Sequence, residues 1–160
     1  MTRTPDRTDR QILTLLLRNA EMSKAELAKR LNIAASAVSE RIKRLRQTGT
    51  IRAFETRIRP EILGYRTLAY IFITEKKPVK GVRTADRLTR IEGVEEVHKI
   101  AGEDCFLVKI RTRDTEELCR ILEDEISTIE TVTGIRTTIV LRTLKEDVAL
   151  GGVDSFEEPA

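Results

Sequence analysis

The chain has 160 residues, enough for one medium domain or two small ones, and its 40% hydrophobic and 34% charged residues are typical of a globular protein. We expect a cytoplasmic protein without a metal or cofactor. We also expect no signal peptide, because residues 1–6 contain no apolar run. The sequence has no run of the roughly 18 apolar residues that cross a bilayer, and no CxxC spacing between its two cysteines. Residues 1–59 hold 14 Lys and Arg but 6 Asp and Glu, a net charge of +8, whereas residues 60–160 carry −5, which indicates a nucleic-acid partner for the first part only.

The first two helices are predicted from apolar periodicity and capping residues. In TDRQILTLLLRNA, which begins at Thr8, apolar residues recur on one helical face, and Thr8 or Asp9 is the expected N-cap. SKAELAKRL begins at Ser23, and Glu26 completes a capping box in which each side chain accepts a hydrogen bond from the other residue's backbone. Both segments are therefore short amphipathic helices.

A third helix is expected at Ala35–Gln47, followed by Gly49 in a left-handed conformation that ends it. The turn between the second and third helices is too short for anything but a sharp change of direction. Three short helices with such a turn match a helix-turn-helix. We therefore predict a DNA-binding domain at residues 1–49, with the motif at about residues 23–42.

The third helix has the pattern of a recognition helix. Val38, Ile42 and Leu45 share the face expected to pack on the core. The remaining surface begins with small residues that allow close approach to a groove floor, and longer polar side chains follow that reach bases and phosphates. The predicted DNA contacts on it, of which Arg41 lies nearest the core edge, are Ser36, Ala37, Ser39, Glu40, Arg41, Lys43, Arg44 and Gln47.

A strand and a hinge are expected to follow the helices. Apolar residues alternate from Ile51 to Ile58, which is typical of a strand, and Pro60 interrupts the pattern. Residues 50–64 are therefore predicted as a strand plus a hinge that links two domains.

The second domain, at residues 65–147, is predicted to be a ferredoxin-like fold of class α+β. Its elements alternate in the order βαββαβ, which gives an antiparallel sheet with two helices on one face. Residues 148–160 are expected to be a flexible tail. The expected strands are 67–74, 94–100, 105–111 and 131–144, and the expected helices are 82–91 and 115–126.

The first strand of this sheet predicts a homodimer. The run from Leu68 to Ile73 is apolar on both faces of the strand. Since the helices cover only one face of such a sheet, the other face needs a cover, and the sheet of a second subunit is the economical one.

Together, these segments make the chain resemble the Lrp/AsnC (feast/famine) regulators over about residues 8–147. The segments that carry the resemblance are TDRQILTLL, SKAELAKRLNI, AVSERIKRLRQTGTI, ILGY, AGEDCFLV and RTLKED. The resemblance implies a winged helix-turn-helix, a ferredoxin-like ligand domain, and dimers that assemble into octamers. It also implies an amino-acid effector at subunit interfaces, near the turn between the second and third strands.

The effector residues are carried over from this resemblance. Gly102 and Asp104 match the family's Gly-x-x-Asp-like turn, and Thr137 matches a Thr common in the last strand. The chain has Glu130-Thr131 where the family favours Pro-Gly, so Thr131 joins the candidate set. A plain hairpin turn explains Gly102 and Asp104 equally well.

One further departure concerns the recognition helix. The family usually has Ser at its N-cap, where this chain has Ala34. Losing such a cap costs about 1 kcal/mol, which predicts a later start for the first turn unless Ser36 or a neighbouring residue compensates.

Two alternatives remain beside sequence-specific regulation. An octamer that wraps DNA with low specificity and binds no effector would have the same composition. Some proteins that resemble this family are tetrapyrrole decarboxylases, but acid–base chemistry usually needs His, and His98 is the only one here. It lies in a predicted strand, so we expect a half-exposed sheet residue and no enzyme.

Overall fold

A computed structural model describes residues 4–76 and 84–146. The chain forms two compact units, one of Met1–Arg57 with Lys145–Ala160 and one of Ile58–Leu144. The tail predicted at 148–160 lies outside the described residues. None of the helices in the described ranges has the length and apolar character needed to cross a membrane.

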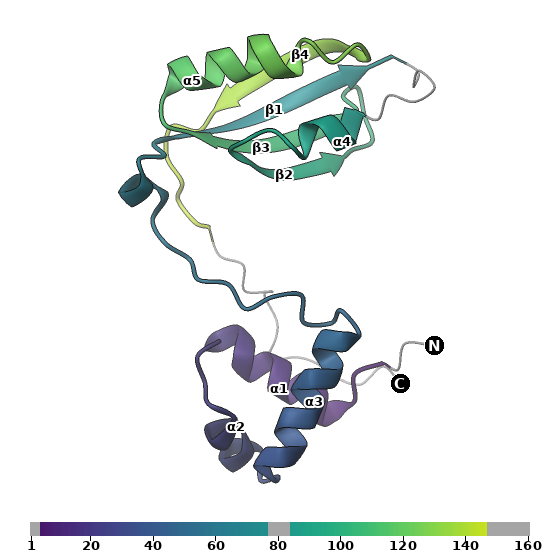
Figure 1. Ribbon diagram of the computed structural model, residues 1–160, viewed down its shortest axis with the longest axis vertical. Coiled ribbons are helices and arrows are strands. Elements are labelled where there is room, and N and C mark those ends of the chain that lie inside the picture. Colours follow the sequence, from purple (N-terminus) through teal and green to yellow (C-terminus); the bar gives the residue numbers. More distant parts are fainter. Residues whose placement is uncertain (1–3, 77–83, 147–160) are drawn as a thin grey trace. The chain divides into compact units, whose positions relative to one another are not determined.

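The first unit is built from α1 (Arg7–Arg18), α2 (Lys24–Leu31) and α3 (Ala35–Gln47), which are labelled in Figure 1. The bounds of α3 match the prediction. One apolar side of each helix faces the other two, and the buried side chains are Ile12, Leu16, Met22, Leu27, Ala28, Val38 and Ile42. Burial of these faces holds three helices together that would each be too short to persist alone.

The helix starts follow local capping chemistry, with two differences from expectation. The N-cap of α1 is Asp6 rather than Thr8 or Asp9, because Asp6 accepts from the Asp9 backbone at 2.9 Å and Asp9 accepts from the Asp6 backbone at 3.2 Å. Ser23 caps α2 as predicted, accepting from the Glu26 backbone at 3.1 Å. The Glu26 carboxylate bonds Arg30 instead of completing the capping box.

Helix α3 begins at Ala35 although its N-cap is Ala34, so the predicted later start is wrong. No side chain caps it, and the Ala34 carbonyl accepts from the Val38 backbone at 3.1 Å. Val38 is fully buried, so packing holds the first turn in place of a cap. Gly49 ends the helix with φ +72°, as predicted.

The strand predicted at Ile51–Ile58 is absent from the described structure. This segment is extended but pairs with no described strand, and Phe54 and Ile58 are exposed. Alternation alone cannot make a strand, because a ladder needs a partner for its N–H and C=O groups. A short 3-10 helix, Pro60–Leu63, follows and ends at Gly64 with φ +86°.

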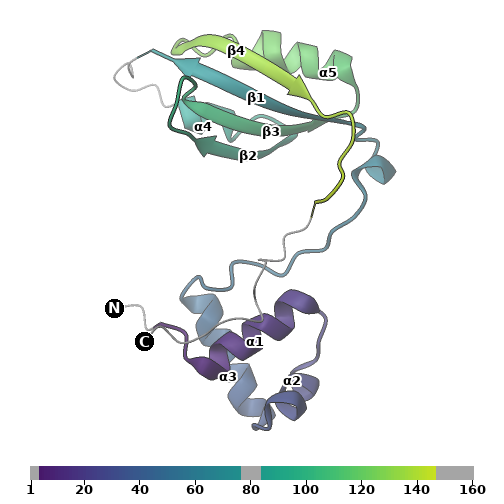
Figure 2. The ribbon, with the colours of Figure 1, turned by 180° about the vertical axis from the view of Figure 1, so that it is seen from behind.

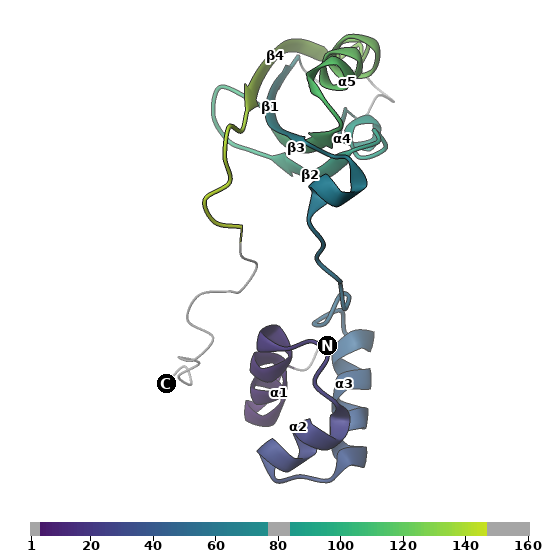
Figure 3. The same cartoon turned by 90° about the vertical axis from the view of Figure 1, so that its left-hand side faces the viewer.

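The second unit is an antiparallel sheet with the strand order β2-β3-β1-β4, and both helices cover one face (Figures 2 and 3). The ferredoxin-like prediction is confirmed. The strands are β1 (Thr67–Glu75), β2 (Val94–Lys99), β3 (Phe106–Thr112) and β4 (Val132–Ile139), and the helices are α4 (Thr84–Leu88) and α5 (Thr115–Arg120), which continues as a π-helix at Ile121–Ile126.

Two element ends differ from the prediction. The last strand ends at Ile139 rather than residue 144: its register with β1 runs to the Ala69–Ile139 pair, and the Val140 N–H makes a last hydrogen bond to the Leu68 carbonyl at 2.8 Å. Within the described residues the first helix ends at Leu88 rather than 91, and hydrogen-bonded turns lead into Gly93. Residues 82 and 83 of that predicted helix lie outside the described part.

Alternation along β1 separates the core face from the open face of the sheet. Ala69, Ile71 and Ile73 are fully buried beneath the helices. Tyr70 and Phe72 point the other way and are half-buried by long side chains of their own sheet. The run is therefore apolar on both faces, as predicted.

Candidate nucleic-acid interface and ligand-domain sites

The two faces of α3 have the polarity of a docking helix. Val38, Ile42 and Leu45 are buried in the first unit, as predicted. The polar side chains of the opposite face project outward, and the exposed ones among the predicted contacts are Ser36, Glu40, Lys43 and Gln47. The buried apolar side chains of α3 therefore support an exposed polar face.

Two of the predicted contacts have partners inside the unit. Arg41 donates to both carboxylate oxygens of Asp6 at 2.8 and 2.7 Å and to Asp9 at 2.8 Å, and Arg44 donates to Asp9 at 2.9 and 2.8 Å. The Asp6 hydrogen bond, followed by that of Asp9, raises the pKa of Arg41 above its ordinary value. The Asp9 side chain is only 3% exposed. This cluster ties the start of α1 to the middle of α3 and so sets the direction of the predicted recognition helix.

The turn between α2 and α3 depends on Asn32. This residue has φ +53° and ψ +46°, in the left-handed region, and it ends α2. Asn tolerates that region better than most residues, because its short polar side chain hydrogen-bonds locally. The sharp turn predicted between the second and third helices is therefore confirmed, and Asn32 makes it.

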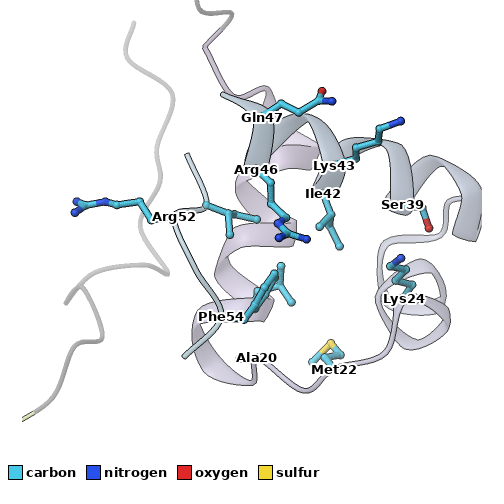
Figure 4. Close-up of a pocket in the computed structure, with 12 residues that line it drawn as sticks. Ala20, Met22, Lys24, Ser39, Ile42, Lys43, Arg46, Gln47, Arg52 and Phe54 are labelled. Atoms are coloured by element: carbon cyan, nitrogen blue, oxygen red, sulfur yellow. The ribbon is translucent and has the colours of Figure 1, made fainter. Parts of the chain in front are cut away.

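A hollow of about 650 Å³ opens beside α3, and sequence reasoning missed it. Leu16, Met22, Ile42, Ile51 and Phe54 line it with apolar surface. Figure 4 shows Arg46 extending into the hollow toward Phe54, while Arg52 extends away from it. Its other lining residues are Ala20, Lys24, Ser39, Lys43 and Gln47, so predicted DNA contacts form part of its wall.

In the second unit, Asp104 lies in a polar cluster on the open face of the sheet. Its carboxylate accepts from Arg136 at 2.7 Å and from the Thr74 hydroxyl at 3.3 Å. The Arg136 guanidinium stacks 3.9 Å from the ring centroid of Phe72. Gly102, two residues before Asp104, is exposed and has φ +152°, as the predicted turn requires. Arg136, Thr74 and Phe72 were missed, since they lie on other strands.

The structure does not bring Thr131 and Thr137 to this cluster. Thr131 is fully buried and shares a hydrogen bond with the Thr84 hydroxyl at 2.7 Å, which leaves its hydroxyl no access to a surface ligand. Thr137 pairs with Ile71 across the sheet and therefore points to the helix-covered face, opposite to Arg136. Register excludes both from an Asp104 site within one chain.

A second hollow, of about 450 Å³, lies in the second unit, and charged side chains in its wall are paired with carboxylates. Arg113 and Glu117 pair in its wall, and this contact lowers the pKa of Glu117 to about 2. Arg111, also in the wall, pairs with Glu95 at 2.7 Å. We assign no ligand to it.

His98 is a half-exposed strand residue, as expected, with 54% of its side chain exposed. Its ring bonds Glu96 at 2.9 Å, which lowers the pKa of that carboxyl. The described residues contain no group of three or more His, Cys, Asp or Glu placed to hold a metal ion.

Comparison with known proteins extends over both units. The family model for the Lrp/AsnC ligand binding domain matches residues 68–150, and a model for a winged helix-turn-helix DNA-binding domain matches residues 5–52. An HTH-type transcriptional regulator of Pyrococcus abyssi is 40% identical over 145 residues, which are 91% of this chain and 95% of that protein.

Solved structures agree with this. The structure of E. coli AsnC has a TM-score of 0.81 at 27% identity, covering 90% of this chain and 97% of that one. A feast or famine regulatory protein from M. tuberculosis, complexed with L-methionine, has a TM-score of 0.83 at 31% identity, covering 91% of this chain and 97% of that one. The chain belongs to the Lrp/AsnC family of transcriptional regulators, with a helix-turn-helix DNA-binding domain and a ligand-binding domain.

Proposed function

We propose that this chain is a cytoplasmic transcription regulator that binds specific DNA sequences as a homodimer. The two α3 helices of the dimer enter successive major grooves. The observation that carries the proposal is the outward polar face of α3, backed by three buried apolar side chains. Dimeric helix-turn-helix proteins bind pseudo-palindromic sites whose half-sites lie about one helical turn apart. We expect the same spacing here.

The contacts proposed on α3 follow from side-chain chemistry. Ser36 and Ala37 are small and let the helix approach the groove floor. Glu40 can accept a hydrogen bond from a cytosine amino group, and Lys43 and Gln47 can reach guanine, adenine or phosphate groups. Arg44 is 39% exposed and can contact phosphate while still paired with Asp9.

The proposal is tested with the triple variant Ser36→Ala, Glu40→Ala and Lys43→Ala. The DNA is a duplex selected from a random library with the wild-type chain. Each bidentate base contact is worth about 1–3 kcal/mol, so the triple variant should bind that duplex about 100-fold more weakly. Fluorescence anisotropy measures the affinity, and circular dichroism checks that the fold is retained.

The matched control is Gln11→Ala with Glu21→Ala, two exposed polar residues on α1 and in the turn after it. It should leave the affinity unchanged. If the triple variant binds as tightly as this control, the recognition-face assignment is wrong. The slope of log affinity against log salt concentration distinguishes sequence-specific binding from low-specificity wrapping. Wrapping should give a steeper slope, since it engages many more phosphates.

The homodimer proposal is supported by the open face of the sheet. Tyr70 and Phe72 lie on it beside Lys109 and Leu107, their respective partners in β3. Both helices cover the opposite face of the sheet (Figure 3). Size-exclusion chromatography with light scattering at micromolar concentration should give a dimer or a multiple of it, up to an octamer. A stable monomer would exclude this interface.

We further propose that an amino-acid effector binds between Asp104 and Arg136, beside the turn that contains Gly102. The Asp104 carboxylate and the Arg136 guanidinium, which pair with each other, could instead bind the ammonium and the carboxylate of the amino acid. The neighbour from M. tuberculosis is complexed with L-methionine. Thr131 and Thr137 do not join this site in a single chain.

A thermal-shift screen against the twenty amino acids tests this. A ligand at about 100 times its dissociation constant stabilises the folded state by about 2.7 kcal/mol, which is a clear rise in Tm. Asp104→Asn should abolish the shift, and the exposed neighbour Glu103→Gln should retain it. A shift that survives Asp104→Asn would place the effector elsewhere.

A further inference from the structure

The hollow beside α3 combines an apolar floor with an unpaired basic rim. Phe54, which is 47% exposed, contributes to this apolar surface. Within the described residues, Lys24, Lys43 and Arg46 form no ion pair, unlike Arg41 and Arg44 on the same unit. Such a hollow suits an extended segment that carries both acidic and apolar side chains.

The chain itself supplies a segment of that chemistry at its end. Residues 147–160 contain four acidic residues and no Lys or Arg. Two of those acids, Glu157 and Glu158, directly follow Phe156, and Val153 precedes the third, Asp154. The segment therefore offers apolar side chains for the floor and carboxylates for the rim.

A hydrogen bond fixes where this segment begins. The Arg57 guanidinium donates to the backbone carbonyl of Glu146, the last described residue, at 3.1 Å. Arg57 is three residues from Phe54, a span of at most about 11 Å, while the ten residues from Glu146 to Phe156 reach about 33 Å when extended. The segment is therefore long enough to return to the hollow, and tethering raises its local concentration to about the millimolar range.

From these observations we infer that residues 147–160 dock in the hollow beside α3 and compete with DNA. Lys43 and Gln47 belong both to the hollow and to the proposed recognition face, so an acidic segment bound there excludes a phosphate backbone. Docking itself is independent of the proposed function. Only the competition depends on it.

A single tryptophan tests docking without DNA. The chain has no Trp, so Phe54→Trp in the full-length protein is a unique fluorescent probe at the floor. Its quenching by acrylamide is compared with the intact tail and with Phe156→Ala, Glu157→Gln and Glu158→Gln together. Docking predicts weaker quenching with the intact tail at low salt, and loss of that protection in the tail variant.

The matched control, Glu116→Gln with Glu130→Gln, removes two negative charges at exposed positions of the second unit. It should leave the quenching unchanged. Exposed ion pairs are worth about 0.2–1 kcal/mol each, so the tail variant should also bind DNA about two- to tenfold more tightly, an effect the control lacks.

Equal quenching of the probe with the intact and altered tails would overturn the docking proposal, whatever the DNA affinity. Protection of the probe by the tail with no gain in DNA affinity in the tail variant would overturn the competition. Failure of the α3 triple variant to weaken DNA binding would instead count against the proposed function and leave the docking result standing.

Discussion

Gly93→Ala is expected to destabilise the ligand-binding domain by about 3 kcal/mol, because two costs coincide at this position. Gly93 has φ +82°, and a Cβ there would lie 2.3 Å from the Arg111 carbonyl oxygen. That oxygen belongs to a backbone that hydrogen-bonds Gly93 itself, with the Arg111 N–H donating to the Gly93 carbonyl at 2.9 Å. Gly93 and Arg111 cannot move apart without breaking this hydrogen bond just before β2 begins. Urea unfolding followed by circular dichroism measures the loss.

Gly64→Ala separates the two costs. Gly64 has nearly the same backbone conformation, φ +86°, but nothing within 4 Å of its Cβ position. Only the left-handed strain remains, so this variant should lose about 1 kcal/mol. Equal losses at both glycines would show that the Arg111 carbonyl yields easily and that our account of the overlap is wrong.

Arg41→Ala should cost the DNA-binding domain about 2 kcal/mol, because it leaves the buried Asp9 carboxylate with one guanidinium partner instead of two. It also removes the two Arg41 hydrogen bonds from Asp6, which caps α1. Thermal unfolding monitored by circular dichroism should show a lower Tm. DNA affinity should fall as well, through loss of helix orientation.

Arg46→Ala is the matched control on the same helix. Arg46 is exposed and forms no ion pair within the described residues, so the loss should stay below about 0.5 kcal/mol. Adding Asp9→Asn to Arg41→Ala should recover part of the stability, because it removes a buried charge that keeps only Arg44 as a guanidinium partner, while an acceptor oxygen remains. A cluster without structural importance would give equal Tm values for Arg41→Ala and Arg46→Ala.

Features that depend only on residues close together in the chain were predictable from the sequence. The bounds of α3, the Ser23 cap and the left-handed Gly49 follow from periodicity and local hydrogen bonding, and the structure confirms them. The βαββαβ order and the family were also predicted from the sequence, because the hydrophobic pattern of each helix or strand is contained in a window of about ten residues.

Tertiary structure decided what depends on distant partners. Asp9 meets Arg41 and Arg44 across more than 30 residues, so no local pattern marks two of the predicted DNA contacts as ion-paired inside the fold. The segment Ile51–Ile58 alternates like a strand, but it has no ladder partner among the described residues. Strand register likewise places Thr137 on the face of the sheet opposite to Arg136 and Asp104. The face on which a strand residue lies depends on how the strands pair, and its neighbours in the sequence do not reveal it.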